Sequence, residues 1–123
     1  QLRQMVRANY SSPPLYGAEL VSTVLSSPDL KLEWETELAQ MKIRIKSMRN
    51  LLVTTLNSGQ SQKDFSFINQ QAGMFSYTGL SAAQAERMKN EFGIYIVDSG
   101  RICVAALNMQ NIEATAESII KVL

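Results

Sequence analysis

The sequence has 123 residues, with 12 basic and 11 acidic side chains and a net charge of +1. Neither sign of charge forms a long block, which argues against nucleic acid or an anionic membrane surface as a partner. The longest apolar runs, such as Leu51–Val53, are far shorter than the ~20 residues of a membrane helix. We therefore expect one soluble domain.

The residue types also limit the chemistry. The sequence has no histidine, which excludes imidazole acid–base catalysis, Ser-His-Asp triads and the common zinc sites. Cys103 is the only cysteine, so an internal disulfide is excluded, and its apolar surroundings favour a small buried side chain in a reducing compartment over a reactive thiol. The sequence begins at Gln1 in what reads as an amphipathic helix, so we expect a piece of a longer polypeptide.

Three helices are predicted in the first part of the chain. Residues 2–8 suit a short helix, which the elbow at residues 9–14 ends because two consecutive prolines favour extended backbone. A second helix fits residues 16–25. Ser27 is a suitable N-cap for a third helix, and Pro28 a suitable first residue.

The third helix is expected to be unusually long. It runs from Pro28 to the stop signal at residues 57–59 and carries apolar side chains at steps of three or four. These are Leu30, Trp34, Leu38, Met41, Ile45, Met48, Leu52 and Leu56. Roughly 30 residues span about 45 Å, more than the width of a small domain. We expect this stripe to pack against a second domain or a partner, rather than to form a cofactor pocket.

The last part of the chain is predicted to hold a small sheet. A polar linker at residues 60–64 comes first. Four strands are expected, at residues 65–68, 74–77, 94–97 and 102–105. A capping box at Ser81 and Gln84 predicts a helix that ends at Gly93, and residues 112–123 form a final amphipathic helix. The fold class is therefore α/β, an α+β domain with a small mixed β-sheet covered by helices and one long bridging helix.

Arg101 is the most informative single residue. It lies between the apolar runs 94–97 and 102–105, where a cation needs an anionic partner. The guanidinium presents a planar fork of donors that matches a carboxylate in two parallel hydrogen bonds. Two readings remain open: a fixed receptor for a carboxylate ligand, or an arginine at a hairpin tip that faces water or an internal glutamate.

Four segments together carry a family resemblance. They are Asn9-Tyr10-Ser11-Ser12-Pro13-Pro14, Gly73-Met74-Phe75-Ser76-Tyr77-Thr78-Gly79-Leu80, Glu91-Phe92-Gly93-Ile94-Tyr95 and Ser99-Gly100-Arg101-Ile102-Cys103-Val104-Ala105. In this order and spacing they closely resemble the C-terminal third of the aspartate and aromatic amino-acid aminotransferases, which are homodimeric pyridoxal-phosphate enzymes of fold type I. The resemblance runs from end to end of the chain.

The resemblance implies roles for particular residues. Arg101 matches the arginine that clamps the substrate α-carboxylate. Arg7 matches the arginine that reaches into the neighbouring subunit and pairs with the side-chain carboxylate of dicarboxylic substrates. Phe75 matches an aromatic residue of the substrate pocket wall, although a core strand residue is an equal alternative. Tyr10 and Ser11 would lie at the dimer interface, beside the cofactor site of the other subunit.

The resemblance also implies an organisation and a reaction. Residues 1–27 would form an interface or interdomain segment and residues 28–123 the small domain, which closes over the substrate. The whole enzyme would transfer the amino group of aspartate, aromatic amino acids or both to 2-oxoglutarate, using pyridoxal 5'-phosphate. Its location would be the cytoplasm, or an organelle if a targeting segment lies upstream of this chain.

The sequence departs from the family pattern at two positions and lacks one part of it. Asp98 stands where many relatives have a small neutral residue and could compete for Arg101, and Ala106 stands where glycine is common. No segment resembles the motifs of the cofactor-binding lysine or of its partner aspartate, which belong to the large domain. We therefore expect no catalytic residue and no activity in this chain alone. The alternative is a stand-alone, non-catalytic α/β module that binds an amino acid or a protein partner.

Overall fold

The computed structural model describes residues 1–11, 13–59 and 63–123. The chain divides into two compact units, residues 1–40 and residues 41–123, and each is described by itself. The predicted elbow at residues 9–14 and linker at residues 60–64 each include positions outside the described residues, so neither is traced in full.

Among the described residues of the first unit, the regular elements are all helices. Helix α1 spans Leu2–Asn9, α2 spans Tyr16–Ser26 and α3 starts at Pro28 and ends at Ser58, within the second unit. All three were predicted within one or two residues. The backbone N–H of Leu30 donates to Oγ of Ser27 at 3.4 Å, which is the expected N-cap of α3.

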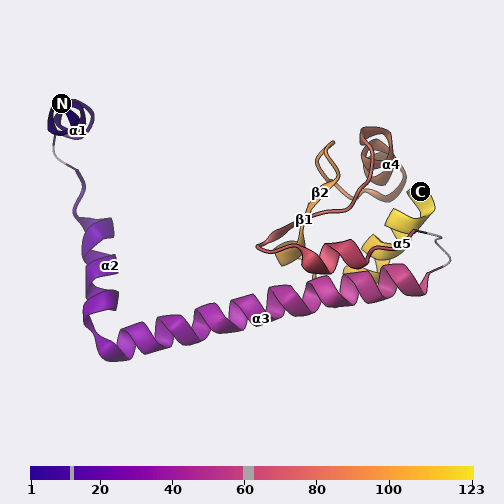
Figure 1. Cartoon of the computed structure of the whole chain (residues 1–123), viewed down its shortest axis with the longest axis horizontal. Helices are drawn as coiled ribbons and strands as arrows, with labels where there is room; N and C mark the ends of the chain where they lie inside the picture. The colour runs from indigo at the N-terminus through magenta and orange to yellow at the C-terminus, as the bar shows by residue number, and fades with distance from the viewer. Residues whose placement is uncertain (12, 60–62) are drawn as a thin grey trace. The chain divides into compact units, whose positions relative to one another are not determined.

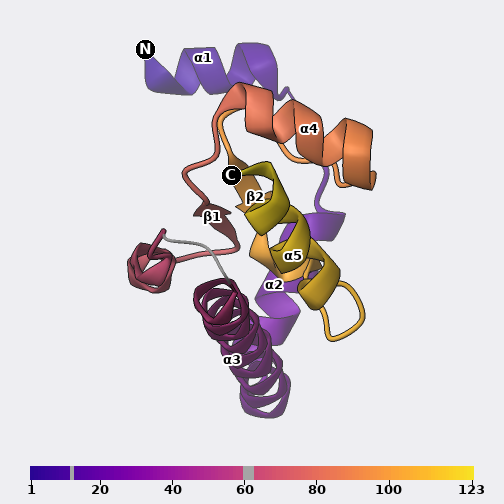
Figure 2. The same cartoon turned by 90° about the vertical axis from the view of Figure 1, so that its right-hand side faces the viewer.

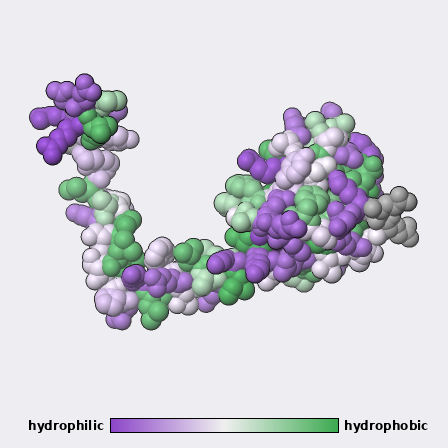
Figure 3. All heavy atoms as spheres, viewed as in Figure 1, coloured by the Kyte–Doolittle hydropathy of each residue, from purple (hydrophilic) through white to green (hydrophobic). Residues whose placement is uncertain are grey.

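Many apolar side chains of this first unit are exposed. None of the residues of α1 or α2 is buried. The exposed large side chains include Leu2, Met5, Val6, Leu20, Val21, Leu25, Leu30, Trp34 and Leu38. Figure 3 shows hydrophobic residues gathered along α2 and the first half of α3. The unit therefore buries little of its own apolar surface, as the length of α3 led us to expect.

The second unit packs short elements against the C-terminal half of α3 (Figure 1). These are the 3₁₀ helix η1 (Ser66–Gln70), strand β1 (Phe75–Tyr77), helix α4 (Ala82–Phe92), strand β2 (Arg101–Cys103), the 3₁₀ helix η2 (Val104–Ala106) and helix α5 (Ile112–Val122). The hydrophobic core draws on every one of them except β1, and includes Leu52, Leu56, Ile68, Met88, Ile102, Val104, Ile112 and Ile119. The end-on view in Figure 2 shows α5 and the two strands beside this part of α3.

The sheet is smaller than predicted. It has two strands, β1 and β2, which are antiparallel rather than mixed. The strand predicted at residues 65–68 is wrong, because the segment forms η1 and buries Phe65 and Ile68, three residues apart, on one side. Asp64 favours this turn by accepting from N–H and Oγ of Ser66 at 2.8 and 2.6 Å, which lowers the pKa of its carboxyl group.

The strand predicted at residues 94–97 is also wrong. Gly93 ends α4 in the left-handed conformation, with φ of +66°, and the Ile94 N–H then donates to the Met88 carbonyl at 3.1 Å. Ile94 therefore belongs to the helix cap. The end of the segment forms a turn, in which the Gly100 N–H donates to the Val97 carbonyl at 2.8 Å. The strand predicted at residues 102–105 is shorter and begins one residue earlier, at Arg101.

The predicted capping of α4 is confirmed. Oγ of Ser81 accepts from the Gln84 N–H at 3.3 Å, and Oε1 of Gln84 accepts from the Ser81 N–H at 2.9 Å. One turn from its end, Arg87 donates to Glu91 at 2.6 Å, a contact that lowers the pKa of Glu91 and raises that of Arg87. Among the described helices, none is both long and apolar enough to cross a bilayer.

Candidate functional site

The two-stranded sheet presents one face to the core and the other to solvent. Ser76 pairs with Ile102, and both are buried. Side chains alternate along a strand, so the flanking residues point to the opposite face. The pairs on that outer face are Phe75 with Cys103 and Tyr77 with Arg101. The sheet thus brings Arg101 and Phe75, predicted separately from the sequence, to the same face.

The turn before Arg101 is tightly held. The Gly100 carbonyl accepts from both the N–H and Oγ1 of Thr78, at 3.0 and 2.7 Å, and Thr78 is fully buried. Gly100 has φ of +74°, and a Cβ at this position would lie 2.5 Å from the Leu80 carbonyl oxygen. Only glycine fits this backbone and this contact without strain. The backbone directly before Arg101 is therefore held in one position.

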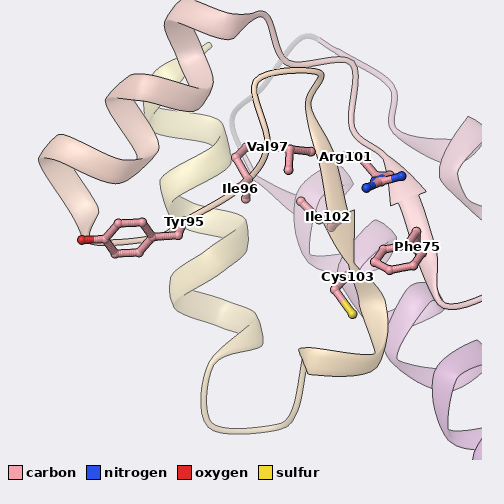
Figure 4. A pocket seen from close by; sticks show the side chains of 7 residues that line it. All are labelled: Phe75, Tyr95, Ile96, Val97, Arg101, Ile102 and Cys103. Carbon is pink, nitrogen blue, oxygen red and sulfur yellow. The ribbon is translucent and has the colours of Figure 1, made fainter.

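The guanidinium of Arg101 stacks against an aromatic ring. Its central carbon lies 4.8 Å from the centroid of Phe75, a cation–π contact. Figure 4 shows the two side chains next to each other on the strands, with the ring of Tyr95 pointing away. Among the described residues no group accepts a hydrogen bond from this guanidinium, so its N–H donors can reach a ligand.

No internal acid neutralises Arg101. Within residues 1–11, 13–59 and 63–123, no carboxylate lies within 4.0 Å of its guanidinium, Asp98 and every glutamate included. The alternative in which Arg101 pairs with an internal glutamate is therefore wrong for the described chain. The competition expected from Asp98 is not observed either.

Two shallow hollows meet at Arg101 and Phe75. The first, of about 290 Å³, is lined by Phe75, Tyr95, Ile96, Val97, Arg101, Ile102 and Cys103. The second is lined by Gln71, Phe75, Ser76, Tyr77, Ser99 and Arg101. Cys103 is half-buried rather than fully buried as predicted, because it faces the first hollow. The mainly apolar walls of the first hollow, with Arg101 as its one cation, suit a ligand that combines a carboxylate with an apolar part.

The other predicted site residues lie in the first unit. Arg7 is on α1, and Tyr10 and Ser11 follow its end. These residues line a separate hollow of about 490 Å³, with Leu2, Arg3 and Val6 as the remaining walls. The structure thus groups Arg7, Tyr10 and Ser11. Their roles at a subunit interface stay predictions.

Two polar residues near the site were not predicted. Gln71 donates to the Tyr77 carbonyl at 3.0 Å and accepts from the Tyr77 N–H at 2.7 Å. Arg49 is buried in α3 and donates to Oγ of Ser76. Nothing in the sequence marks Gln71. Arg49 stands three residues before Leu52, on the apolar stripe of the helix, and this misplaced charge was a signal that could have been read.

The family follows from the sequence as a whole. Residues 1–119 match the family described as Aminotransferase class I and II. The chain belongs to this family. The resemblance seen in four segments therefore extends over nearly the whole chain.

Named relatives and solved structures agree with this assignment. The chain is 52% identical to an aspartate aminotransferase of Pseudomonas aeruginosa and 46% identical to an aromatic-amino-acid aminotransferase of Escherichia coli, over its whole length in both cases. It superposes with a TM-score of 0.95, at 52% identity over 99% of its length, on an aromatic-amino-acid aminotransferase from Burkholderia pseudomallei solved covalently bound to pyridoxal phosphate.

The aminotransferase segment is only part of such a protein. It spans 31% of the length of both curated relatives and 31% of the Burkholderia chain. The predicted assignment to the C-terminal region of an aspartate or aromatic aminotransferase is confirmed.

Proposed function

We propose that this chain is the substrate-clamping part of a pyridoxal-phosphate-dependent aminotransferase. The whole protein would transfer the amino group of aspartate, of aromatic amino acids or of both to 2-oxoglutarate. Family membership supports the reaction class, and the relatives named above include both an aspartate and an aromatic-amino-acid aminotransferase.

The observation that carries the proposal is the state of Arg101. Its guanidinium is exposed, lies over the Phe75 ring and has no carboxylate within 4.0 Å among the described residues. A ligand carboxylate can therefore approach in the plane of the fork and accept two charge-assisted hydrogen bonds. Phe75 would hold the guanidinium in one orientation and exclude water from one side of the pair, which strengthens the attraction.

A second carboxylate would be read by Arg7. We assign it to the side-chain carboxylate of a dicarboxylic substrate bound in the neighbouring subunit of a homodimer, with Tyr10 and Ser11 at the interface beside that subunit's cofactor. Support comes from the grouping of these three residues around one exposed hollow. In this scheme residues 1–27 are the interface segment, and residues 28–123 are the small domain that closes over the substrate.

The cofactor itself would be held by other parts of the protein. The residues that line the three hollows described above include no lysine, so they offer no amine to bond pyridoxal phosphate. What they offer are the guanidinium groups of Arg3, Arg7 and Arg101, which have no carboxylate within 4.0 Å among the described residues and suit the carboxylates of an amino acid. The role of this chain is thus to bind and orient the substrate.

We also propose a reducing compartment, the cytoplasm in the simplest case. Cys103 is a free thiol with no disulfide partner in the chain. Among the relatives, Dictyostelium discoideum has one named cytoplasmic and one named mitochondrial enzyme.

The proposal is tested by Arg101→Lys in the full-length protein. Lysine keeps the charge but loses the bidentate contact, so kcat/KM for aspartate and for phenylalanine should fall about a hundredfold, the equivalent of one to two charged hydrogen bonds. Arg87→Lys is the matched control, because Arg87 contacts Glu91 and the end of α5, away from the hollows. It should leave both values near wild type.

Two results would count against the proposal. If Arg101→Lys behaves like Arg87→Lys, Arg101 does not bind the substrate. If the full-length protein neither binds pyridoxal phosphate by its absorbance between about 330 and 430 nm nor converts either amino acid, the reading as a non-catalytic binding module is favoured.

A further inference from the structure

A buried arginine anchors the strand that carries Phe75. Arg49 of α3 is 6% exposed. Its Nε donates to Oγ of Ser76 at 3.1 Å, and its Nη2 donates to the Gly73 carbonyl. Ser76 is itself 2% exposed. Within the described residues, no carboxylate lies within 4.0 Å of this guanidinium, so its partners are neutral groups of one short segment, residues 73–76.

Such an arrangement is costly for the fold. A guanidinium loses its hydration when it is buried, and neutral oxygens replace that hydration only partly. The neighbouring buried positions of the same helix are apolar: Leu52, Val53 and Leu56. An apolar side chain at position 49 would satisfy the core equally well. The charge therefore needs a reason beyond packing, and the contacts with residues 73–76 supply one.

The anchored strand is weak by itself. Strand β1 has three residues and belongs to a sheet of two strands, which is marginal without further support. Ser76 is its only residue on the core face, and Phe75 and Tyr77 flank it on the outer face. Because Arg49 holds the residues on both sides of Phe75, it limits the positions that the Phe75 ring can take on the outer face of the sheet. That ring in turn lies over the guanidinium of Arg101.

We propose that Arg49 is a positioning residue for the substrate carboxylate site, acting through Ser76 and Phe75 on Arg101. This inference rests on the proposed function of Arg101. Arg49 lines none of the three hollows. It reduces the number of orientations open to the Phe75 ring, and so it keeps the fork of Arg101 aligned before a carboxylate arrives.

A purely structural role predicts a different outcome from a positioning role. Loss of a structural contact lowers the unfolding midpoint and leaves the substrate affinity of the folded enzyme unchanged. Loss of a positioning contact raises KM for the amino acid in enzyme that is still folded. The two roles are separated by measuring KM, kcat and the thermal midpoint on the same preparations.

The experiment uses the full-length enzyme loaded with its cofactor. Arg49→Met should raise KM for aspartate about tenfold and change kcat little, since one misaligned charged hydrogen bond is worth roughly that factor. Arg49→Lys keeps the charge and should recover part of the loss. Lys46→Met, which removes a charge from an exposed position of the same helix, should match wild type.

A double-mutant cycle links the effect to Arg101. When the clamp is already lost in Arg101→Lys, the further change Arg49→Met should alter KM by less than about twofold. An equal rise in both backgrounds, or no rise in either, would overturn the positioning role. If Arg101→Lys alone leaves the kinetics of wild type, the proposed function fails, and this inference fails with it.

A second variant tests the same contact. If Arg49→Met does not fold, Ser76→Ala removes only the hydroxyl acceptor and keeps the Gly73 contact. It should raise KM for aspartate by about threefold to tenfold, in line with one ordinary hydrogen bond. An unchanged KM in Ser76→Ala would also overturn the positioning role.

Discussion

Gly100→Ala offers a sharp test of how Arg101 is held in place. Gly100 has φ of +74°, a conformation that costs an alanine about 1–2 kcal/mol. The added Cβ would also lie 2.5 Å from the Leu80 carbonyl oxygen and 3.1 Å from the Leu80 nitrogen. Both contacts are with backbone, so the turn itself has to move.

That movement should break the hydrogen bonds that Thr78 donates to Gly100. Thr78 gives two hydrogen bonds to the Gly100 carbonyl, and each is worth about 1 kcal/mol. Together with the backbone cost, the loss in free energy of unfolding should be about 3–4 kcal/mol. Gly93→Ala is the matched control, because Gly93 has φ of +66° and no atom within 4 Å of its would-be Cβ. It should lose only about 1 kcal/mol.

Urea unfolding of the full-length protein measures both losses. Hydrogen exchange at the Thr78 amide provides a local reading, because this N–H donates to the Gly100 carbonyl. Exchange there should accelerate in Gly100→Ala and stay near wild type in Gly93→Ala. If the two variants lose the same free energy within about 0.5 kcal/mol, close approach to Leu80 does not constrain the turn and the reasoning fails.

Two further predictions concern helix α4. Ser81→Ala removes one half of the capping box with Gln84 and should lower the free energy of unfolding by about 1 kcal/mol, whereas a loss below about 0.3 kcal/mol would show that the cap is unimportant. Glu91→Gln tests the contact with Arg87 through pH. The pKa of Glu91 is lowered in the folded state, so its stabilisation is complete above the ordinary value of 4.5 and disappears as the pH falls through the folded value. The gap in thermal midpoint between wild type and Glu91→Gln should therefore shrink below about pH 4.5, and a gap independent of pH would contradict this origin.

The helices were predictable because their signals are local. The N-cap at Ser27, the capping box at Ser81 and the glycine at position 93 each act through neighbouring residues. Apolar residues at steps of three or four lie between such signals, so both the ends and the apolar face of each helix could be predicted. The exposed start of the stripe on α3 was also foreseen, from helix length alone.

The strands were predicted less well because short apolar runs do not identify their partners. Residues 65–68 alternate apolar and polar side chains, and residues 94–97 form a short apolar run, so both were interpreted as strands. In the first, Asp64 and Asn57 take the hydrogen bonds that a neighbouring strand would need. In the second, the cap of α4 does so at Ile94. The pattern of apolar residues does not show that side-chain and cap hydrogen bonds will compete with strand pairing.

The site was predictable only in part. The proposed role of Arg101 came from its charge among apolar neighbours, and that of Phe75 from family resemblance. The contact between Phe75 and Arg101 joins residues 26 positions apart. It depends on the pairing of Phe75 with Cys103 and of Tyr77 with Arg101. The contribution of Arg49 required the same register together with the burial of Ser76. No local pattern contains that information.

The contact between Gln71 and Tyr77 has a consequence for association between chains. Strand β1 turns one edge toward β2, and its other edge would expose free N–H and carbonyl groups that can pair with a strand of another molecule. The side-chain amide of Gln71 already forms hydrogen bonds with the N–H and the carbonyl of Tyr77, and Arg49 donates to the carbonyl of Gly73. This edge of the sheet is thereby blocked at Tyr77 and Gly73 against pairing with a further strand.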